Sequence, residues 1–181
     1  MKALRFLTIV SLLAWGGPAQ AVAAGVSFGP NDVRSAFYVA KSENQNQVHY
    51  GVQLDAACRP VGTRPVFAYW RRLKSGKRVD EPLIGAGLRV YGASDEQQVK
   101  SFAAGGQVQM FVRALDKVRI DIRVEKTASG CKASASTTLK GAKARLSHAY
   151  LQLGAFALRV RYVDVIGYRL SDGLKVSERF D

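Results

Sequence analysis

The densest group of side chains that could bind a charged ligand is a basic cluster beside a predicted turn. Arginine can hold a phosphate or a carboxylate through two parallel hydrogen bonds, and lysine adds a point charge. The cluster consists of Arg71, Arg72, Lys74, Lys77 and Arg78, with the aromatic residues Tyr69 and Trp70 directly before it. The two rings could stack on a ligand or anchor at an interface. The sequence therefore predicts a ligand-binding site here, with a purely solubilising role for the charges as the alternative.

The two histidines are the candidates for general acid–base chemistry. His49 lies on the polar face of a predicted strand, and His148 lies near Tyr150 in another. A hydrolase of the Ser-His-Asp type needs its base held between a nucleophile and a carboxylate, and no such set stands out in the sequence. A metal site is disfavoured because no carboxylate lies at ligand spacing from either histidine. We therefore expect packed or surface histidines, and no catalytic residue, metal or cofactor.

Two aspartates lie within predicted strands rather than in loops. Asp121 alternates with Arg119 and Arg123, so charge pairing on one strand face explains it. Asp164 shares its strand face with large apolar and aromatic residues such as Ile166, and the pattern assigns that face to the core. A buried carboxylate needs a charged or hydrogen-bonding partner. An arginine is the expected partner, and a bulge that turns Asp164 outward is the alternative.

Cys58 and Cys131 are the only cysteines in the chain. An even number of cysteines after a secretory signal favours a disulfide, because thiols are oxidised outside the cytoplasm. The bridge would close a long loop and contribute roughly 4 kcal/mol in chain-entropy terms. Two unpaired buried thiols are the alternative. A zinc site is disfavoured because metal-binding cysteines usually occur in close pairs.

The first residues have the pattern of a secretory signal peptide. Lys2 and Arg5 form a positive start, residues 6–15 are apolar, and Ala19-Gln20-Ala21 has the spacing that signal peptidases cut. The apolar run is shorter than the roughly 20 residues that cross a bilayer. A retained anchor and cleavage after Ala23 stay open as alternatives. We expect a signal peptide at 1–21, a loose leader at 22–33 and a single β domain at 34–181, located in the periplasm or outside the cell.

The chain has a large excess of positive charge. Its formal net charge is +13, and removal of Lys2 and Arg5 with the signal would leave +11. In an exported protein such a surplus favours anionic partners. We expect an anionic lipid, lipopolysaccharide or a wall polymer rather than nucleic acid, and a monomer without a transmembrane segment after cleavage. The alternative is that the charge only keeps the protein soluble.

Alternation of apolar and polar residues predicts strands along most of the chain. The clearest case is 118–125, where Val118, Ile120 and Ile122 alternate with charged residues, as in an antiparallel sheet with one face in water. Tight turns are predicted at 74–77 and 171–173. The predicted strands are 35–40, 47–54, 65–73, 99–103, 107–115, 118–125, 131–139, 144–153, 156–170 and 174–180.

These short strands predict an all-β fold. The expected architecture is an antiparallel β-barrel or barrel-like sandwich of about 8–10 strands, with a short helical segment near 80–90. A parallel α/β architecture would need long helical crossovers, which the sequence does not contain. Many glycines at bend positions favour the barrel over the sandwich.

Several segments resemble one protein family. They are the aromatic strand Pro65-Val66-Phe67-Ala68-Tyr69-Trp70-Arg71-Arg72, then Val48-His49-Tyr50, Tyr91-Gly92, and the closing hairpin from 162–167 to Gly173 and Glu178. The family is an uncharacterised one of exported bacterial proteins, catalogued only as a domain of unknown function. The resemblance spans roughly 34–180 and implies one exported β domain. It implies no activity, ligand or catalytic residue.

Together these features favour a non-catalytic exported β domain that binds an anionic or amphipathic component of the cell envelope. The first alternative is a periplasmic hydrolase that uses His49 or His148 as its base. The second is a structural or protein-interaction module, which an exposed sheet edge would favour.

Overall fold

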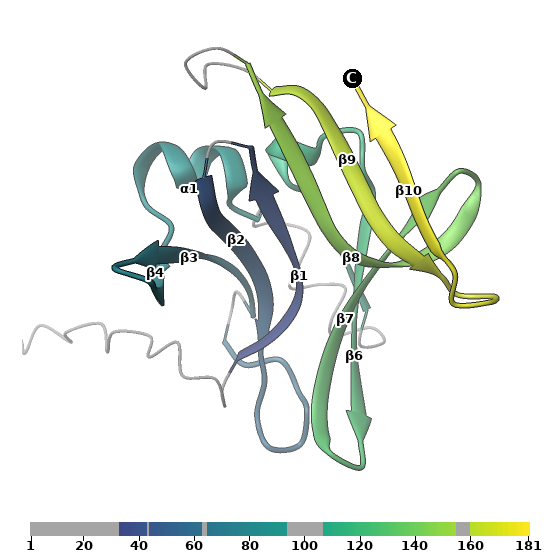
Figure 1. The fold of residues 1–181 in the computed structure, drawn as a ribbon. Coiled ribbons are helices and arrows are strands. Elements are labelled where there is room, and N and C mark those ends of the chain that lie inside the picture. Colours follow the sequence, from purple (N-terminus) through teal and green to yellow (C-terminus); the bar gives the residue numbers. More distant parts are fainter. Residues whose placement is uncertain (1–32, 43, 63–64, 94–106, 155–159) are drawn as a thin grey trace, which may run out of the picture.

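The computed structural model describes residues 33–42, 44–62, 65–93, 107–154 and 160–181. The predicted signal peptide, nearly all of the leader and the predicted strand at 99–103 lie outside these ranges. The described residues form ten strands, one short α-helix and one 3-10 helix (Figure 1). The elements are β1 (Val33–Lys41), β2 (Asn44–Gln53), β3 (Val66–Lys74), β4 (Lys77–Pro82), α1 (Gly85–Tyr91), β5 (Gln107–Met110), η1 (Arg113–Leu115), β6 (Ile120–Thr127), β7 (Gly130–Leu139), β8 (Ala142–Leu153), β9 (Val160–Arg169) and β10 (Lys175–Phe180).

The strands build one sheet from two antiparallel meanders, β1–β4 and β5–β10. Within each meander every described strand pairs with its neighbour in sequence. The meanders meet where β1 runs parallel to β8, from Tyr38 opposite His148 to Lys41 opposite Leu151. We call this pairing the β1–β8 seam.

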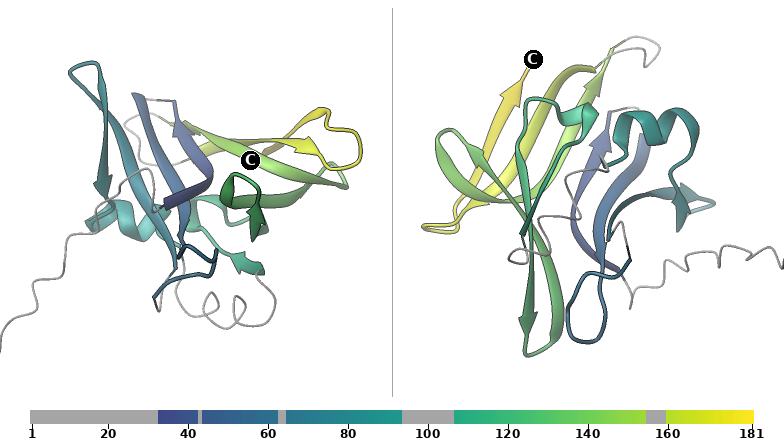
Figure 2. Two further views of the ribbon diagram at one scale, coloured as in Figure 1. Left: turned by 90° about the horizontal axis from the view of Figure 1, so that it is seen from below. Right: turned by 180° about the vertical axis from the view of Figure 1, so that it is seen from behind.

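Strand β8 makes the seam possible because it is long enough for three partners. It pairs with β9 over most of its length, with β7 along its first half and with β1 along its second half. A register shift between Leu146 and His148 marks the change of partner and leaves Ser147 in a bulge. Bulges bend a strand and increase its twist. Seen from below, β1–β3 and β8–β10 consequently lie in two planes inclined to each other (Figure 2, left).

The predicted all-β class is confirmed, in the form of an open, barrel-like sheet rather than a closed barrel. In the described ranges β4, β5 and β10 each pair on one side only. The sheet is not wholly antiparallel, because the seam is a parallel pair. No helix of these ranges is both long and apolar enough to cross a membrane.

The hydrophobic core lies on the concave inner face of the sheet. Alternate residues of each strand point there, since successive side chains of a strand face opposite sides. Helix α1 and the β5–η1 segment close the rear of this core (Figure 2, right). Tyr50 is fully buried and donates a 2.7 Å hydrogen bond to the carbonyl oxygen of Tyr91, which ties β2 to α1. The opposite face of the sheet, the outer face, carries the polar residues discussed below.

Most predicted elements are confirmed with shifted ends. The predicted helix is α1 at 85–91, but residues 80–82 belong to β4, a strand that the sequence pattern did not reveal. The predicted strand 107–115 is a four-residue strand followed by the 3-10 turn η1. The turn at 74–77 is confirmed, with Ser75 and Gly76 both in the left-handed region at φ 49° and 75°. Two such residues are typical of the hairpin turns that match the twist of the flanking strands.

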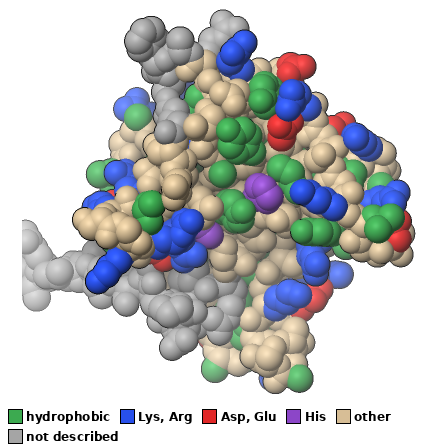
Figure 3. Space-filling view, viewed as in Figure 1, with side chains coloured by type: hydrophobic (Ala, Val, Ile, Leu, Met, Phe, Trp, Pro, Cys, Tyr) green, Lys and Arg blue, Asp and Glu red, His purple; other side chains and the backbone are tan. Residues whose placement is uncertain are grey.

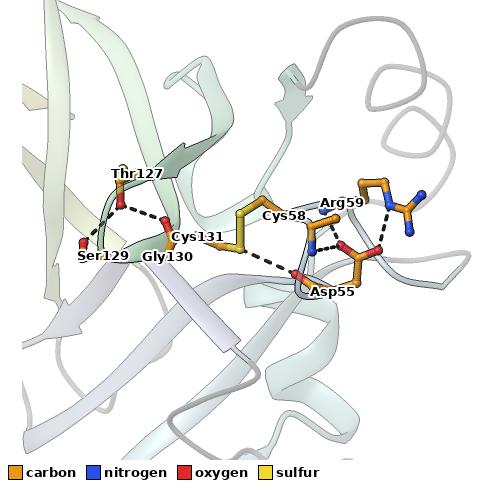
Figure 4. The surroundings of a disulfide bond; sticks show 8 residues. Asp55, Cys58, Arg59, Thr127, Ser129, Gly130 and Cys131 are labelled. Atoms are coloured by element: carbon orange, nitrogen blue, oxygen red, sulfur yellow. Dashed lines mark hydrogen bonds and ion pairs between the residues drawn. A yellow bond between two sulfur atoms is a disulfide. The ribbon is translucent and has the colours of Figure 1, made fainter.

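The predicted disulfide between Cys58 and Cys131 is confirmed, with Cα atoms 5.2 Å apart (Figure 4). Cys58 lies in the turn after β2, and Cys131 lies at the start of β7, so the bond joins the two meanders. Asp55 organises the turn: its carboxylate accepts hydrogen bonds from the backbone N–H groups of Ala57 and Arg59 and pairs with the Arg59 guanidinium at 2.8 Å. Cys58 itself has a φ of 64°, a conformation that is costly for a residue with a side chain.

Candidate functional site

The basic cluster lies on the β3–β4 hairpin, and strand alternation divides it between two faces. Tyr69 and Arg71 lie on the outer face. Trp70 lies on the inner face, where it is buried at 8% exposure and meets Tyr91 edge-on at 5.7 Å. The Arg72 guanidinium and the Lys41 ammonium lie over the Trp70 ring at 5.2 and 4.9 Å. Tyr69 and Trp70 therefore do not form one aromatic surface.

Much of the positive charge of the cluster is compensated within the hairpin. Arg71 makes a bidentate pair with Asp80, with N–O distances of 2.8 and 2.9 Å. This hydrogen-bonded pairing raises the pKa of Arg71. Arg72 lies 3.3 Å from Glu81, which also accepts from Lys74. Of the predicted ligand-binding cations, Lys77 and Arg78 make no ion pair with a described carboxylate.

A row of four stacked rings crosses the outer face from β3 to β8, and we call it the ring row. It runs through Tyr69, His49, Tyr38 and His148, with centroid distances of 5.5, 5.3 and 4.9 Å. Both candidate histidines are thus brought together, one on each side of Tyr38. Because stacked rings cover one another's faces, a ligand on this surface would meet mainly ring edges. The row crosses the β1–β8 seam between its last two members.

His49 is held on both ring nitrogens. The Ser35 hydroxyl donates to Nδ1 over 3.2 Å, and Nε2 donates to Oε1 of Gln47 over 3.0 Å. The same amide oxygen also accepts from Arg78 at 3.3 Å, which supports this assignment of donor and acceptor. Burial, followed by the positive charge of Arg71, lowers the pKa of His49 from 6.5 to about 4. The imidazole is therefore neutral at pH 7.

His148 is more exposed and lies beside the bulge in β8. Its Nδ1 lies 3.1 Å from the hydroxyl of Ser147. Burial lowers the pKa of His148, and the nearby charge of Lys175 lowers it further. In the described part of the chain, no set of three histidine, cysteine or acidic side chains is arranged to bind a metal ion.

A polar row runs beside the ring row and ends in an arginine–aspartate pair on each side. In register, it contains Arg71, Gln47, Ala40, Tyr150 and Asp164. Asp80 closes the row at β4, and Arg179 closes it at β10. The smallest side chain of the row, Ala40, lies at its centre next to the seam.

The sequence assigned the face of β9 that carries Asp164 to the core, and this is wrong. Val163 and Val165 point inward instead, while Asp164 lies on the outer face and is only half-buried. The expected arginine partner is confirmed: Arg179 binds Asp164 through two hydrogen bonds of 2.7 and 2.8 Å. These bonds lower the pKa of Asp164. The Arg179 guanidinium also stacks over Tyr162 at 3.8 Å.

Asp121 has the expected charge pairing on its strand face. It is 8% exposed and lies 3.8 Å from both Arg119 and Lys143. Arg123, the other neighbour in the alternation, pairs with Glu125 at 3.9 Å instead.

The residues that sequence reasoning missed are Ser35, Tyr38 and Gln47, which hold the histidines. Gln47 was signalled in the sequence by the polar alternation around His49. Ser35 and Tyr38 had no such signal, because only the pairing of β1 with β2 and β8 places them beside the histidines.

The described surface also has a cleft of about 280 Å³ where the η1 turn meets the ends of β9 and β10. Its lining combines the cations Arg113, Lys117 and Arg161 with the rings of Tyr162 and Phe180. Lys117 donates a hydrogen bond to the backbone oxygen of Asp181 across this cleft. The cleft is a hollow of the surface, separate from the ring row.

Comparison with known proteins supports the family resemblance. No curated protein and no solved structure matches the chain. The family model "Domain of unknown function (DUF4833)" matches residues 37–179. The match begins in β1 and ends in β10, so it includes both meanders, the disulfide, the ring row and the polar row. The chain therefore belongs to the family described as domain of unknown function DUF4833.

Proposed function

We propose that this chain is an exported, non-catalytic β domain that binds an anionic component of the cell envelope. The observation that supports the proposal is the state of the charges on the described surface. Most described carboxylates are already paired with a cation of the same chain. These are Asp55, Asp80, Glu81, Asp121, Glu125, Asp164 and Asp172.

The surplus of positive charge is therefore exposed and available to an external partner. The exposed cations without an ion pair in the described ranges include Lys77, Arg113, Lys126, Lys132, Lys140, Arg145, Arg161 and Lys175. In the view of the outer face, Lys and Arg side chains lie at several places around the histidines, with acidic side chains scattered among them (Figure 3). Such a field attracts anionic surfaces and raises the rate of encounter. The basic hairpin is one part of this field rather than a separate site.

Export is supported by the signal-like start of the sequence and by the disulfide, since such bonds persist in oxidising compartments. The mass of the protein isolated from a periplasmic extract tests it. Cleavage after Ala21 or Ala23, together with the loss of two hydrogens for the disulfide, is expected. A mass that includes Met1 to Ala21 would count against a cleaved signal.

Vesicle binding tests the electrostatic part of the proposal. We expect the protein to co-sediment with vesicles that contain phosphatidylglycerol at low salt, and to bind pure phosphatidylcholine vesicles far more weakly. Binding should weaken steeply between 50 and about 300 mM salt, because exposed charges are screened within about 8–10 Å at physiological ionic strength. A soluble anionic polysaccharide serves as the polymer arm of the test. Equal, weak binding to charged and neutral vesicles and no binding to the polymer would refute the proposal.

A hydrolase is the second candidate, because the hydrogen bond from Ser35 to Nδ1 of His49 resembles a nucleophile held by a base. Two features disfavour it. Gln47, rather than a carboxylate, orients the ring, and a pKa of about 4 makes His49 a weak base at neutral pH. A second serine, in Gly25-Val26-Ser27-Phe28-Gly29, has the spacing of a nucleophile elbow but lies outside the described residues. Esterase activity that is lost in both Ser35→Ala and His49→Gln would establish this alternative.

The third candidate is a protein-interaction module. The outer edge of β10 has no neighbouring strand among the described residues, and such an edge can accept a strand from another protein. A stable partner recovered from an envelope extract and lost when Ser177 is replaced by proline would favour this candidate, because proline cannot donate to a new strand.

A further inference from the structure

We propose that the β9–β10 turn is the part of the protein that enters the interface of an anionic lipid bilayer. We call this turn the leucine tip, defined by Leu170 and Leu174. The inference rests on the proposed function and deepens it, because it names the envelope component as a lipid surface. It also names the residues that distinguish insertion from attraction by charge alone.

The leucine tip exposes the larger part of two apolar side chains to water. Leu170 is 62% exposed and Leu174 is 57% exposed, on either side of the turn 171–173. Tyr168 follows on the outer face at 39% exposure. Tyrosine is enriched at membrane interfaces because its ring is apolar and its hydroxyl is polar. Two leucines and a tyrosine at one hairpin end thus match the headgroup–acyl boundary.

The turn holds its leucines in a fixed arrangement. Backbone hydrogen bonds of 2.9 Å join the Arg169 N–H to the Leu174 carbonyl and the Gly173 N–H to the Arg169 carbonyl. The Asp172 carboxylate accepts from the Leu174 N–H at 3.0 Å and pairs with Arg169 at 2.7 Å. The charge of Asp172 is therefore neutralised inside the turn. A preformed turn loses little conformational entropy when it binds.

Cations surround the base of the tip. The Leu170 N–H donates to the Lys143 carbonyl at 2.9 Å, which places the tip beside the start of β8. Arg145 and Lys175 flank Tyr168 in register on β8 and β10. The neighbouring acid Glu178 accepts from the backbone N–H of Lys140, and Asp121 lies 3.8 Å from Lys143. Arg145, Lys175 and the ammonium of Lys140 remain for lipid headgroups.

The combination of features favours a lipid bilayer over a polyanionic polymer. A polymer would use the cations but would leave both leucines in water. A bilayer with anionic headgroups would contact the cations through its headgroups and the leucines through its acyl chains. Each cation near such a surface contributes about fivefold in affinity. A second exposed apolar pair is formed by Ile84, the N-cap of α1, and Leu88 within α1, with 73% and 54% exposure. It lies on the other side of the molecule from the tip (Figure 1), so it supplies a matched control.

The test compares the binding of the exported chain and its variants to vesicles. Leu170→Ser with Leu174→Ser is expected to weaken binding to phosphatidylglycerol vesicles by about thirtyfold, from the loss of leucine burial. Ile84→Ser with Leu88→Ser should leave binding unchanged. Lys175→Gln should weaken binding by about fivefold. All four leucine and isoleucine positions are exposed, so circular dichroism and urea midpoints are expected to match those of the parent protein.

A reporter at the tip tests insertion directly. Leu170→Trp should show a blue-shifted emission with phosphatidylglycerol vesicles and quenching by lipids brominated on their acyl chains. The same signals should be absent with phosphatidylcholine vesicles and with a soluble anionic polysaccharide. Leu88→Trp is the matched control and should show neither change.

The outcomes separate this inference from the proposed function. If the parent binds charged vesicles and the Leu170/Leu174 variant binds equally well, the leucine tip is refuted while envelope binding stands. If the parent binds the polysaccharide but not the vesicles, the lipid inference also fails. If the parent binds neither, both proposals fail. Loss of vesicle binding in the tip variant alone, with retained polysaccharide binding, supports the inference.

Discussion

Loss of the Cys58–Cys131 disulfide should lower the free energy of unfolding by about 4 kcal/mol. The bond closes a loop over a sequence separation of 73 residues. It also joins the turn after β2 to the start of β7, and thus one meander to the other. A chain without it is expected to fold to the same sheet, but with a smaller margin of stability.

The magnitude follows from the entropy of the unfolded chain. For a loop closed over 73 residues, the lost entropy is about 15 cal/mol/K, or about 4.4 kcal/mol at 25 °C. Domains of this class are stabilised by only about 5–15 kcal/mol in total. The disulfide is therefore expected to supply a large share of the stability of this protein.

Urea unfolding followed by tryptophan fluorescence measures the effect. Trp70 is buried in the core at 8% exposure, so its emission should report loss of packing. With a denaturant slope of about 2 kcal/mol per molar, Cys58→Ser with Cys131→Ser should lower the midpoint by about 2 M. The parent protein treated with reductant is the matched control, and its midpoint should equal that of the Cys58→Ser, Cys131→Ser variant. Cys58→Gly with Cys131→Ser should recover up to about 1 kcal/mol, because the φ of 64° at position 58 strains a residue with a side chain.

One result would refute this reasoning. If the serine variant unfolds within about 1 kcal/mol of the parent, while the parent itself is shown by its mass to be oxidised, the loop-entropy argument fails. The unfolded state would then have to be compact enough to hold positions 58 and 131 close together without the bond.

Three further predictions concern single residues. Gly167→Ala should destabilise the protein by about 2 kcal/mol in urea unfolding, because a Cβ there would lie 2.6 Å from the carbonyl oxygen of Arg145; a parent-like midpoint would contradict the close approach of β9 to β8. As the pH falls from 6.5 to about 4, the unfolded chain binds a proton at His49 before the folded chain does, so stability should fall across this window. His49→Gln should remove that part of the loss, and an NMR titration of His49 with a pKa near 6.5 would overturn the prediction. The pKa of Asp164 is lowered mainly by its hydrogen bonds from Arg179, so the pair stabilises fully above the ordinary value of 3.8, and its effect is lost progressively as the pH falls from there through the lower pKa of the folded state. Arg179→Gln should therefore destabilise the protein more at pH 7 than at pH 2, and an equal loss at both would count against this pairing.

Local sequence patterns predicted the hairpins well, because their geometry is decided within a few residues. The turn before Lys77 contains Ser75 and Gly76, and the left-handed conformation of both fixes the β3–β4 connection. Strand β4 was nevertheless missed. It is an edge strand whose residues are exposed or half-buried, so it has no buried face to impose alternation. Charged edge strands of this kind are common in natural sheets.

The face of β9 could not be chosen from hydrophobicity, since both faces are apolar. One carries Tyr162, Ile166 and Tyr168, and the other carries Val163 and Val165. Larger residues favoured the first face in the sequence pattern, but the second is buried. Close packing decides the orientation, because Gly167 on the inner side lets β9 approach the Arg145 backbone.

The ring row could not be predicted because it depends on a pairing between distant residues. Tyr38 and His148 are 110 positions apart (148 minus 38) and meet only because β1 lies beside the second half of β8. Nothing local in either strand encodes that register. The basic cluster showed the opposite difficulty: its residues are adjacent in sequence, but alternation sends Trp70 to the core and Tyr69 to the outer face.

The β1–β8 seam has a consequence for the order in which the protein folds. Every other described strand pair is a contact between sequence neighbours, and such local pairs form fast. The seam alone requires closure of a long chain segment. The chain loses the entropy of closing this segment before the contacts between β1 and β8 can stabilise it. Docking of the two meanders is thus the expected rate-limiting step of refolding. Stacking of Tyr38 on His148 would then mark the completion of this docking step. A Cys58–Cys131 disulfide formed beforehand would accelerate docking, because it already holds the two meanders close together.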